Sequence, residues 1–131
     1  MIAIDTNLLV RHLTQDDPAQ AAKVAVLLTK ATADDEMVFL SDIVLCETWW
    51  VLVRFYGVKR TDLLSALTRV LADPLFAFQN RAEIGAALST CRAGRGHFAD
   101  HLISNLARCA GCRTTYSFEK GLGSAAGFTR L

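Results

Sequence analysis

The chain has 131 residues, of which 52% are hydrophobic, so it is long and apolar enough for one packed domain and is not a disordered tail. The formal net charge is +1, which excludes a broadly basic surface, so any contact with nucleic acid must be local. No apolar run approaches the roughly 20 residues of a membrane span, and no secretory signal is visible. We therefore expect a cytoplasmic protein with no membrane partner and with reduced cysteines.

The first residues carry the strongest local signal. A short apolar run, residues 1–4, ends abruptly at Asp5, and apolar spacing then resumes. This pattern predicts a buried strand followed by a helix over residues 6–14. Ligands of open α/β sheets bind at the carboxyl ends of the strands, so Asp5 is a candidate metal ligand. The alternative interpretation is that Asp5 only caps the helix.

Apolar spacing and turn residues predict the remaining elements. In chain order they are helices over 19–33 and 43–56, with a strand over 37–40 between them; a helix ending at 72; a strand over 75–78; helices over 81–91 and 97–110; a strand over 113–116; and an edge strand over 128–131. The predicted helix caps are Asp17, Ser41-Asp42 and Thr61-Asp62. Alternating strands and helices predict a single α/β domain over residues 1–131, with a mostly parallel sheet of four to five strands and helices on both faces.

Three further acidic residues accompany Asp5. Glu47 stands inside an apolar helix, where a buried carboxylate is costly unless it is paired or bound to a metal; the alternative is an exposed position on the polar edge. Asp100 falls in the first turn of a helix, where the macrodipole favours an anion. Glu119 follows just past a strand.

All four carboxylates are expected near the carboxyl edge of the sheet. Four like charges in one pocket repel one another and raise each other's pKa unless a cation neutralises them. An all-oxygen site favours Mg²⁺ or Mn²⁺ over zinc. The chemistry that this arrangement predicts is hydrolysis of phosphodiester bonds.

Cysteine and histidine suggest two weaker alternatives. Cys109 and Cys112 have CxxC spacing, but a zinc site needs a second pair, so we interpret them as core residues at a helix end. His97 and His101 lie four residues apart on one helix face, which invites a zinc interpretation. The zincin motif requires Glu where Phe98 stands, so His97 is interpreted as a residue of the helix start.

Four short segments, taken together and in order, resemble one family. They are Ile4-Asp5-Thr6-Asn7, residues 41–47 (SDIVLCE), residues 98–103 (FADHLI) and residues 115–120 (TYSFEK). With these segments the chain resembles a PIN-domain ribonuclease, in particular a VapC-type toxin of a bacterial toxin–antitoxin pair. The resemblance extends over nearly the whole chain.

The resemblance implies a three-layer α/β/α domain that binds Mg²⁺ or Mn²⁺ and cleaves RNA, leaving 5′-phosphate and 3′-hydroxyl ends. Asp5 and Asp100 match the metal-binding aspartates of the family, Glu47 matches its acidic residue after the second strand, and Asn7 matches the residue that supports the first aspartate. Such toxins form homodimers and are silenced by a cognate antitoxin protein, whose tail enters the pocket.

The late motif departs from the family pattern. Where Thr-Phe-Asp is usual, this chain has Ser117-Phe118-Glu119. Glutamate keeps the charge but reaches one methylene further, so Glu119 is expected to hold a second metal or orient water. Arg92, Arg95 and Lys120 are the candidate contacts to the RNA backbone.

Two alternatives follow from other function classes. The first is a catalytically weak PIN-like module that binds RNA or a protein partner without cutting, and the change at Glu119 is its support. The second is a small phosphatase, which would need a second aspartate at position 7 in place of Asn7.

Overall fold

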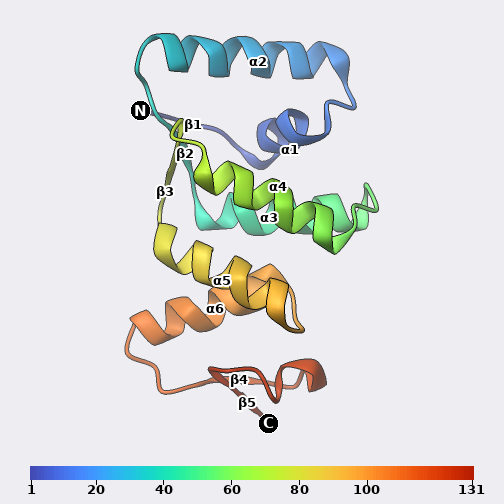
Figure 1. Cartoon of the computed structure of the whole chain (residues 1–131), viewed down its shortest axis with the longest axis vertical. Helices are drawn as coiled ribbons and strands as arrows, with labels where there is room; N and C mark the ends of the chain where they lie inside the picture. Colours follow the sequence, from blue (N-terminus) through green and yellow to red (C-terminus); the bar gives the residue numbers. More distant parts are fainter. The chain divides into compact units, whose positions relative to one another are not determined.

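The computed structural model describes residues 1–131, which form two compact units, Met1–Arg81 and Ala82–Leu131 (Figure 1). The elements are β1 (Ile2–Ala3), α1 (Thr6–Thr14), α2 (Pro18–Ala33), β2 (Val38–Leu40), α3 (Asp42–Arg54), α4 (Arg60–Ala72), β3 (Phe76–Phe78), α5 (Arg81–Ala93), α6 (Phe98–Cys109), β4 (Thr115–Ser117), the short 3-10 helix η1 (Lys120–Leu122) and β5 (Phe128–Arg130).

The first unit contains a three-stranded parallel sheet in the order β1-β2-β3. Ile2 is in register with Val38, and Val38 is in register with Phe76. Because parallel strands all end at one edge, the chain leaves β1 at Asp5 and β2 at Ser41 on the same side of the sheet. This edge therefore determines where the polar residues after each strand lie.

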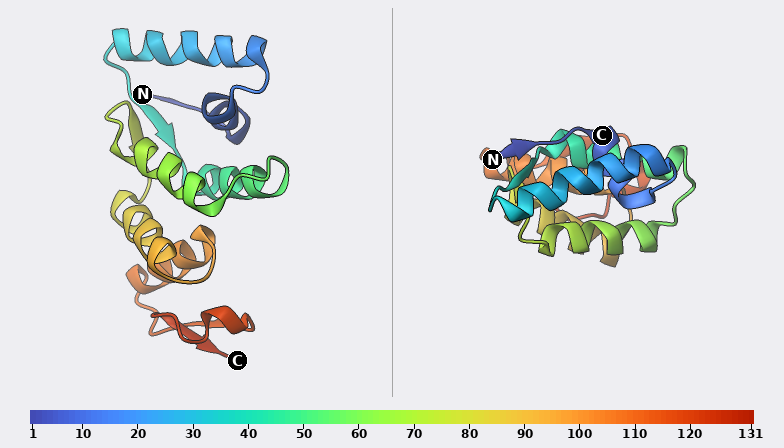
Figure 2. Two further views of the ribbon diagram at one scale, coloured as in Figure 1. Left: turned by 45° about the vertical axis from the view of Figure 1, so that its right-hand side comes forward. Right: turned by 90° about the horizontal axis from the view of Figure 1, so that it is seen from above.

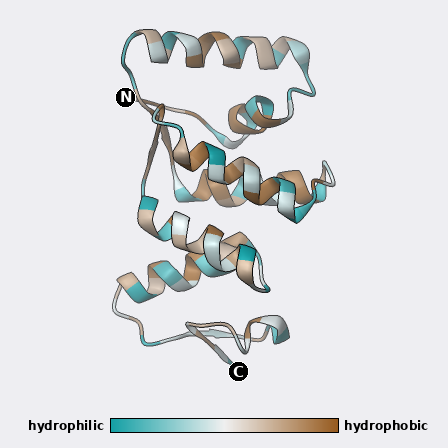
Figure 3. Cartoon of the chain, in the orientation of Figure 1, coloured by the Kyte–Doolittle hydropathy of each residue, from teal (hydrophilic) through white to brown (hydrophobic).

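The helices of the first unit cover apolar side chains of the strands and of one another. Figure 3 shows hydrophobic stretches on the strands and on α3 and α4, and Leu9, Val38 and Leu63 are fully buried. Helix α1 packs against both α2 and α3. In the left view of Figure 2, α2 runs across the page while α1 is seen nearly end-on, so these two helices cross.

Two of the three predicted caps are confirmed. Asp17 accepts a hydrogen bond from the backbone N–H of Gln20, and Ser41 accepts one from that of Val44. The third is wrong, because α4 begins at Arg60 and its N-cap is Lys59, which makes no capping bond with its side chain. The packing of the buried leucines of α4 sets the start of this helix, and the capping preference of the sequence is the weaker effect.

The second unit contains α5, α6 and a parallel pair of strands, β4 and β5. The side-chain amide of Asn105 on α6 donates to the carbonyl of Glu83 on α5 over 3.2 Å. Gly111 ends α6 with a φ of +90°, a conformation in which glycine carries no steric cost. The expected edge strand near the end of the chain is confirmed as β5.

The prediction of an α/β fold with parallel strands is confirmed. The five strands pair as a sheet of three in the first unit and a sheet of two in the second. No helix combines the length and the apolar character that crossing a membrane requires.

Candidate metal centre and neighbouring cavities

Asp5 caps α1 with one carboxylate oxygen, and its other oxygen remains unbonded. It is the N-cap residue, and its Oδ1 accepts a hydrogen bond of 3.0 Å from the backbone N–H of Leu8. The side chain is exposed, and its Oδ2 makes no hydrogen bond within the protein. Asp5 therefore caps α1, and its role as a metal ligand stays a prediction.

Glu47 lies on the exposed side of α3, so the exposed alternative describes it and the buried one is wrong. Its Oε2 accepts a hydrogen bond of 2.5 Å from the hydroxyl of Thr6, the first residue of α1. Since Thr6 follows Asp5 directly, this bond ties Glu47 to the end of β1. No role was predicted for Thr6 from the sequence, although its place between Asp5 and Asn7 was the available signal.

Asp5 and Glu47 line one open cavity of about 420 Å³, together with Thr6, Asn7, Trp50 and Val51. Two carboxylates, an amide and a hydroxyl provide hard oxygen donors, which fit Mg²⁺ or Mn²⁺ and do not fit a soft metal. Within neither unit do three or more His, Cys, Asp or Glu side chains form a group that could hold a metal. This cavity therefore supplies two of the predicted carboxylate ligands, and their binding of metal stays a prediction.

A second cavity, of about 510 Å³, begins at the same residues. It shares Asp5 and Asn7 with the first cavity and continues between α1 and α2, where it is lined by Leu8, Arg11, Gln20, Lys23, Val24 and Leu27. The two cavities thus share Asp5 and Asn7, and the second forms a groove between α1 and α2 that carries two cationic side chains. This groove was not predicted from the sequence.

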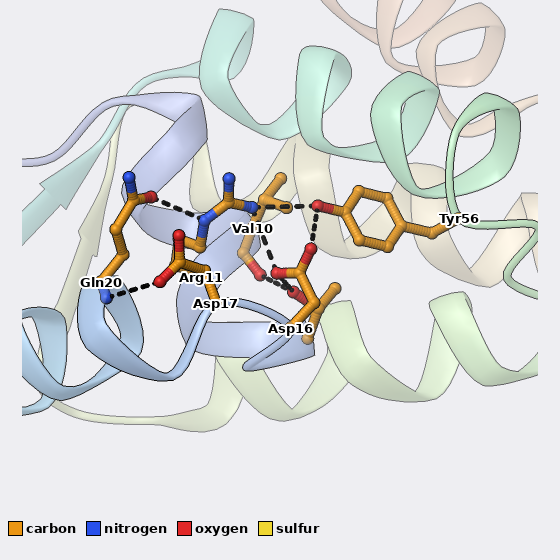
Figure 4. A network of polar contacts seen from close by, with 7 residues as sticks. Val10, Arg11, Asp16, Asp17, Gln20 and Tyr56 are labelled. Atoms are coloured by element: carbon orange, nitrogen blue, oxygen red, sulfur yellow. Dashed lines mark hydrogen bonds and ion pairs between the residues drawn. The ribbon is translucent and has the colours of Figure 1, made fainter.

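A network of polar contacts holds Arg11 in place, as Figure 4 shows. Its Nε donates to Gln20 on α2 over 2.7 Å, and its Nη1 donates to the Tyr56 hydroxyl over 2.9 Å and to Asp16 over 3.2 Å. The Tyr56 hydroxyl in turn donates to Asp16 over 2.7 Å. This hydroxyl is the main cause that raises the pKa of Arg11 and lowers the pKa of Asp16.

In the second unit, Asp100 stabilises the start of α6. Its Oδ2 accepts a hydrogen bond of 2.8 Å from the backbone N–H of His97, the N-cap residue, and lies 3.4 Å from Nδ1 of His97. The helix-start interpretation of His97 is confirmed. A role for Asp100 as a metal ligand stays a prediction.

Glu119 lies in an exposed turn immediately after β4. It is the N-cap of η1, and its Oε1 accepts a hydrogen bond of 3.3 Å from the backbone N–H of Gly121. The Ser117 hydroxyl accepts one of 3.0 Å from the backbone N–H of Glu119. Ser117 therefore shapes the turn that presents Glu119.

Arg95 and His101 belong to another cavity of the second unit, with a volume of about 320 Å³. The carbonyl of Arg95 lies 2.7 Å from Nε2 of the buried His101. Because a carbonyl only accepts, this nitrogen carries a proton. The Arg95 side chain is exposed.

The core interpretation of the CxxC pair is wrong, because Cys109 and Cys112 are both exposed. Cys109 donates to Glu83 over 3.3 Å, and this hydrogen bond is the main cause that raises the pKa of the thiol.

Comparison with known proteins adds one finding. A family model described as PIN domain matches residues 2–127, which cover both compact units. No curated protein matches the chain.

Proposed function

The chain belongs to the PIN domain family, and from this premise we propose that it is a metal-dependent endoribonuclease that acts as the toxin of a toxin–antitoxin pair. The observation that carries the proposal is the single open cavity into which the carboxylates of Asp5 and Glu47 both project. Oxygen ligands of this kind suit the divalent metals that nucleases of this family typically use.

The roles of the residues follow from their hydrogen bonds. Asp5 is held by its capping bond and offers Oδ2, while Glu47 is held by Thr6 and offers Oε1. Asn7 lines the same cavity, and we propose that it supports Asp5. When bound, a divalent cation neutralises the phosphate charge and lowers the pKa of an attacking water.

We propose that Asp100 and Glu119 provide the remaining carboxylates. Asp100 keeps Oδ1 outside the capping bond, and Glu119 keeps Oε2 outside its turn. Ser117 supports Glu119 through the backbone. Arg95 is the proposed RNA contact of the second unit because its side chain is exposed at a cavity.

The proposed partners are RNA, a cognate antitoxin and a second copy of the chain. Helix α3 supports a surface for a protein partner, since Trp50 is 41% exposed and Phe55, which caps its end, is 82% exposed. Trp49 is buried and belongs to the core. Light scattering of the purified chain measures whether it is a dimer.

Cleavage of a pooled structured RNA tests the function. We expect cutting with Mg²⁺ or Mn²⁺, no cutting with EDTA, products with 5′-phosphate ends, and loss of cutting in Asp5→Asn. Asp62→Asn is the matched control, because Asp62 is an exposed residue of α4 that does not line either cavity. Glu119→Ala shows whether the unusual glutamate serves catalysis.

The outcome that contradicts the proposal is equally specific. If the folded wild-type chain cuts no RNA with either metal yet binds RNA, the chain is the binding module considered as the alternative. Cutting that survives Asp5→Asn would show that the carboxylate cavity is not the active site.

A further inference from the structure

The groove between α1 and α2 has a feature that the metal centre does not use. Lys23 is exposed on α2, lines the groove and makes no ion pair or hydrogen bond. Other charged residues nearby are already paired, such as Lys30 with Asp34 at 2.5 Å and Arg11 with Asp16 at 3.2 Å. An unpaired ammonium group in a groove is available for an anion from solution.

Arg11 adds a second donor that is fixed in position. Its Nε and Nη1 are occupied by Gln20, Tyr56 and Asp16, whereas Nη2 has no partner within the protein (Figure 4). A guanidinium that is held on one side loses little conformational entropy when its other side binds a phosphate. The network therefore prepares Arg11 to bind an anion.

The remaining walls of the groove are apolar. Val24 and Leu27 on α2 face Leu8 on α1, and the helical spacing of Gln20, Lys23 and Leu27 places these residues along one side of α2. A chain with regularly spaced negative charges and apolar faces between them matches such walls, and single-stranded RNA is such a chain.

The position of the groove favours RNA as its occupant. The groove meets the carboxylate cavity at Asp5 and Asn7, which line both. An RNA strand whose scissile phosphate lies beside Asp5 must continue for at least one nucleotide away from it, and the groove is a cationic path that leads away. An acidic peptide would also satisfy Lys23, and the tail of the proposed antitoxin would reach the same pocket, so a protein occupant is the alternative outcome of the test.

We propose that the α1–α2 groove binds the sugar-phosphate backbone of single-stranded RNA beside the scissile bond, with Lys23 and Arg11 on a neighbouring phosphate. The inference rests on the proposed function, because that function supplies the RNA and its direction. Lys23 and Arg11 are positioning residues, and neither takes part in the bond-breaking step.

Binding of a short, fluorescently labelled single-stranded RNA in EDTA tests the groove without cleavage. One phosphate contact contributes a slope of about 0.7 to the logarithm of affinity against the logarithm of salt, or about fivefold in affinity between 0.1 and 1 M. We expect Lys23→Gln to raise Kd by about fivefold at 0.1 M salt and to flatten this slope by about 0.7. The matched control is Lys30→Gln on the same helix, outside the groove.

Kinetics give a second measurement. In Mn²⁺, Lys23→Gln is expected to raise KM and leave kcat unchanged, because Lys23 positions RNA without touching the reacting phosphate. A Kd, salt slope and KM for Lys23→Gln equal to those of Lys30→Gln would overturn the inference and leave the groove to a protein partner.

The two proposals fail in different ways. If the wild type binds RNA through Lys23 but does not cut it with metal, the proposal of RNA binding in the groove is supported and the nuclease proposal fails. If the wild type cuts RNA and Lys23→Gln behaves as the control Lys30→Gln, the nuclease proposal is supported and the proposal of RNA binding in the groove fails. A wild type that neither binds nor cuts RNA contradicts both.

Discussion

Asp5 combines two roles that its position after β1 makes compatible. One carboxylate oxygen caps α1, and Asp5 also lines the cavity that it shares with Glu47. Asparagine caps helices about as well as aspartate, whereas alanine does not. The two substitutions therefore separate the structural role of Asp5 from its charge.

We expect Asp5→Ala to lower the free energy of unfolding by about 1 kcal/mol and Asp5→Asn to change it by less than about 0.5 kcal/mol. Urea denaturation in EDTA measures both. Equal destabilisation by the two substitutions would show that the hydrogen bond to Leu8 does not stabilise α1.

The hydrogen bond from the Tyr56 hydroxyl to Asp16 makes the free energy of unfolding depend on pH. Its hydrogen bond lowers the pKa of Asp16 in the folded state, so the stabilisation is complete above the unfolded value of about 3.9 and is lost as the pH falls through the lower folded value. We expect Tyr56→Phe to destabilise the chain at pH 7 and to destabilise it less at pH 3.

Denaturation at the two pH values, with Tyr116→Phe as the control, checks this prediction. Tyr116 is 58% exposed, and its hydroxyl makes no hydrogen bond within the protein. If Tyr56→Phe lowers the free energy of unfolding by as much at pH 3 as at pH 7, the hydroxyl does not stabilise the chain through Asp16.

At the scale of elements, the turn before α6 is fixed by close packing. Gly96 has a φ of +93°, and a Cβ there would lie 2.6 Å from Cδ2 of the buried Leu122 and 3.1 Å from Nε2 of His101. Gly111, after α6, has a φ of +90° with nothing within 4 Å of such a Cβ. The two glycines therefore share the same backbone strain and differ in packing.

We expect Gly96→Ala to destabilise the chain by about 1–2 kcal/mol more than Gly111→Ala, since overpacking adds to the shared strain. Thermal and urea denaturation of both variants measure the difference. Equal destabilisation by the two substitutions would mean that the side chains of Leu122 and His101 move aside without loss of stability.

At the scale of the whole molecule, local signals predicted the elements well. Apolar spacing placed α1 at its observed bounds and located every strand, because buried faces require that spacing. The start of α4 was missed because packing extends the helix back to Arg60, ahead of the predicted caps Thr61-Asp62. A single sequence shows the apolar periodicity and the capping and turn residues. It does not show whether packing or capping determines where a helix begins.

Features that depend on distant residues were not predictable. The hydrogen bond from Thr6 to Glu47 joins residues 41 positions apart, and the contact between Arg11 and Tyr56 joins residues 45 apart. The groove that Lys23 lines is formed between α1 and α2, so it depends on how these two helices pack. Sequence spacing identified the acidic residues by type and strand position, while their surroundings follow from the tertiary structure.

The central claim is that the predicted carboxylates hold a divalent cation, and a Mn²⁺ titration of the full chain by calorimetry tests it most directly. We expect Asp5→Asn, Glu47→Gln, Asp100→Asn and Glu119→Gln each to weaken binding by about tenfold or more, as loss of a charged ligand does, with Asp62→Asn unchanged. Mn²⁺ affinity that stays at the wild-type value in Asp5→Asn and in Glu47→Gln would contradict the account.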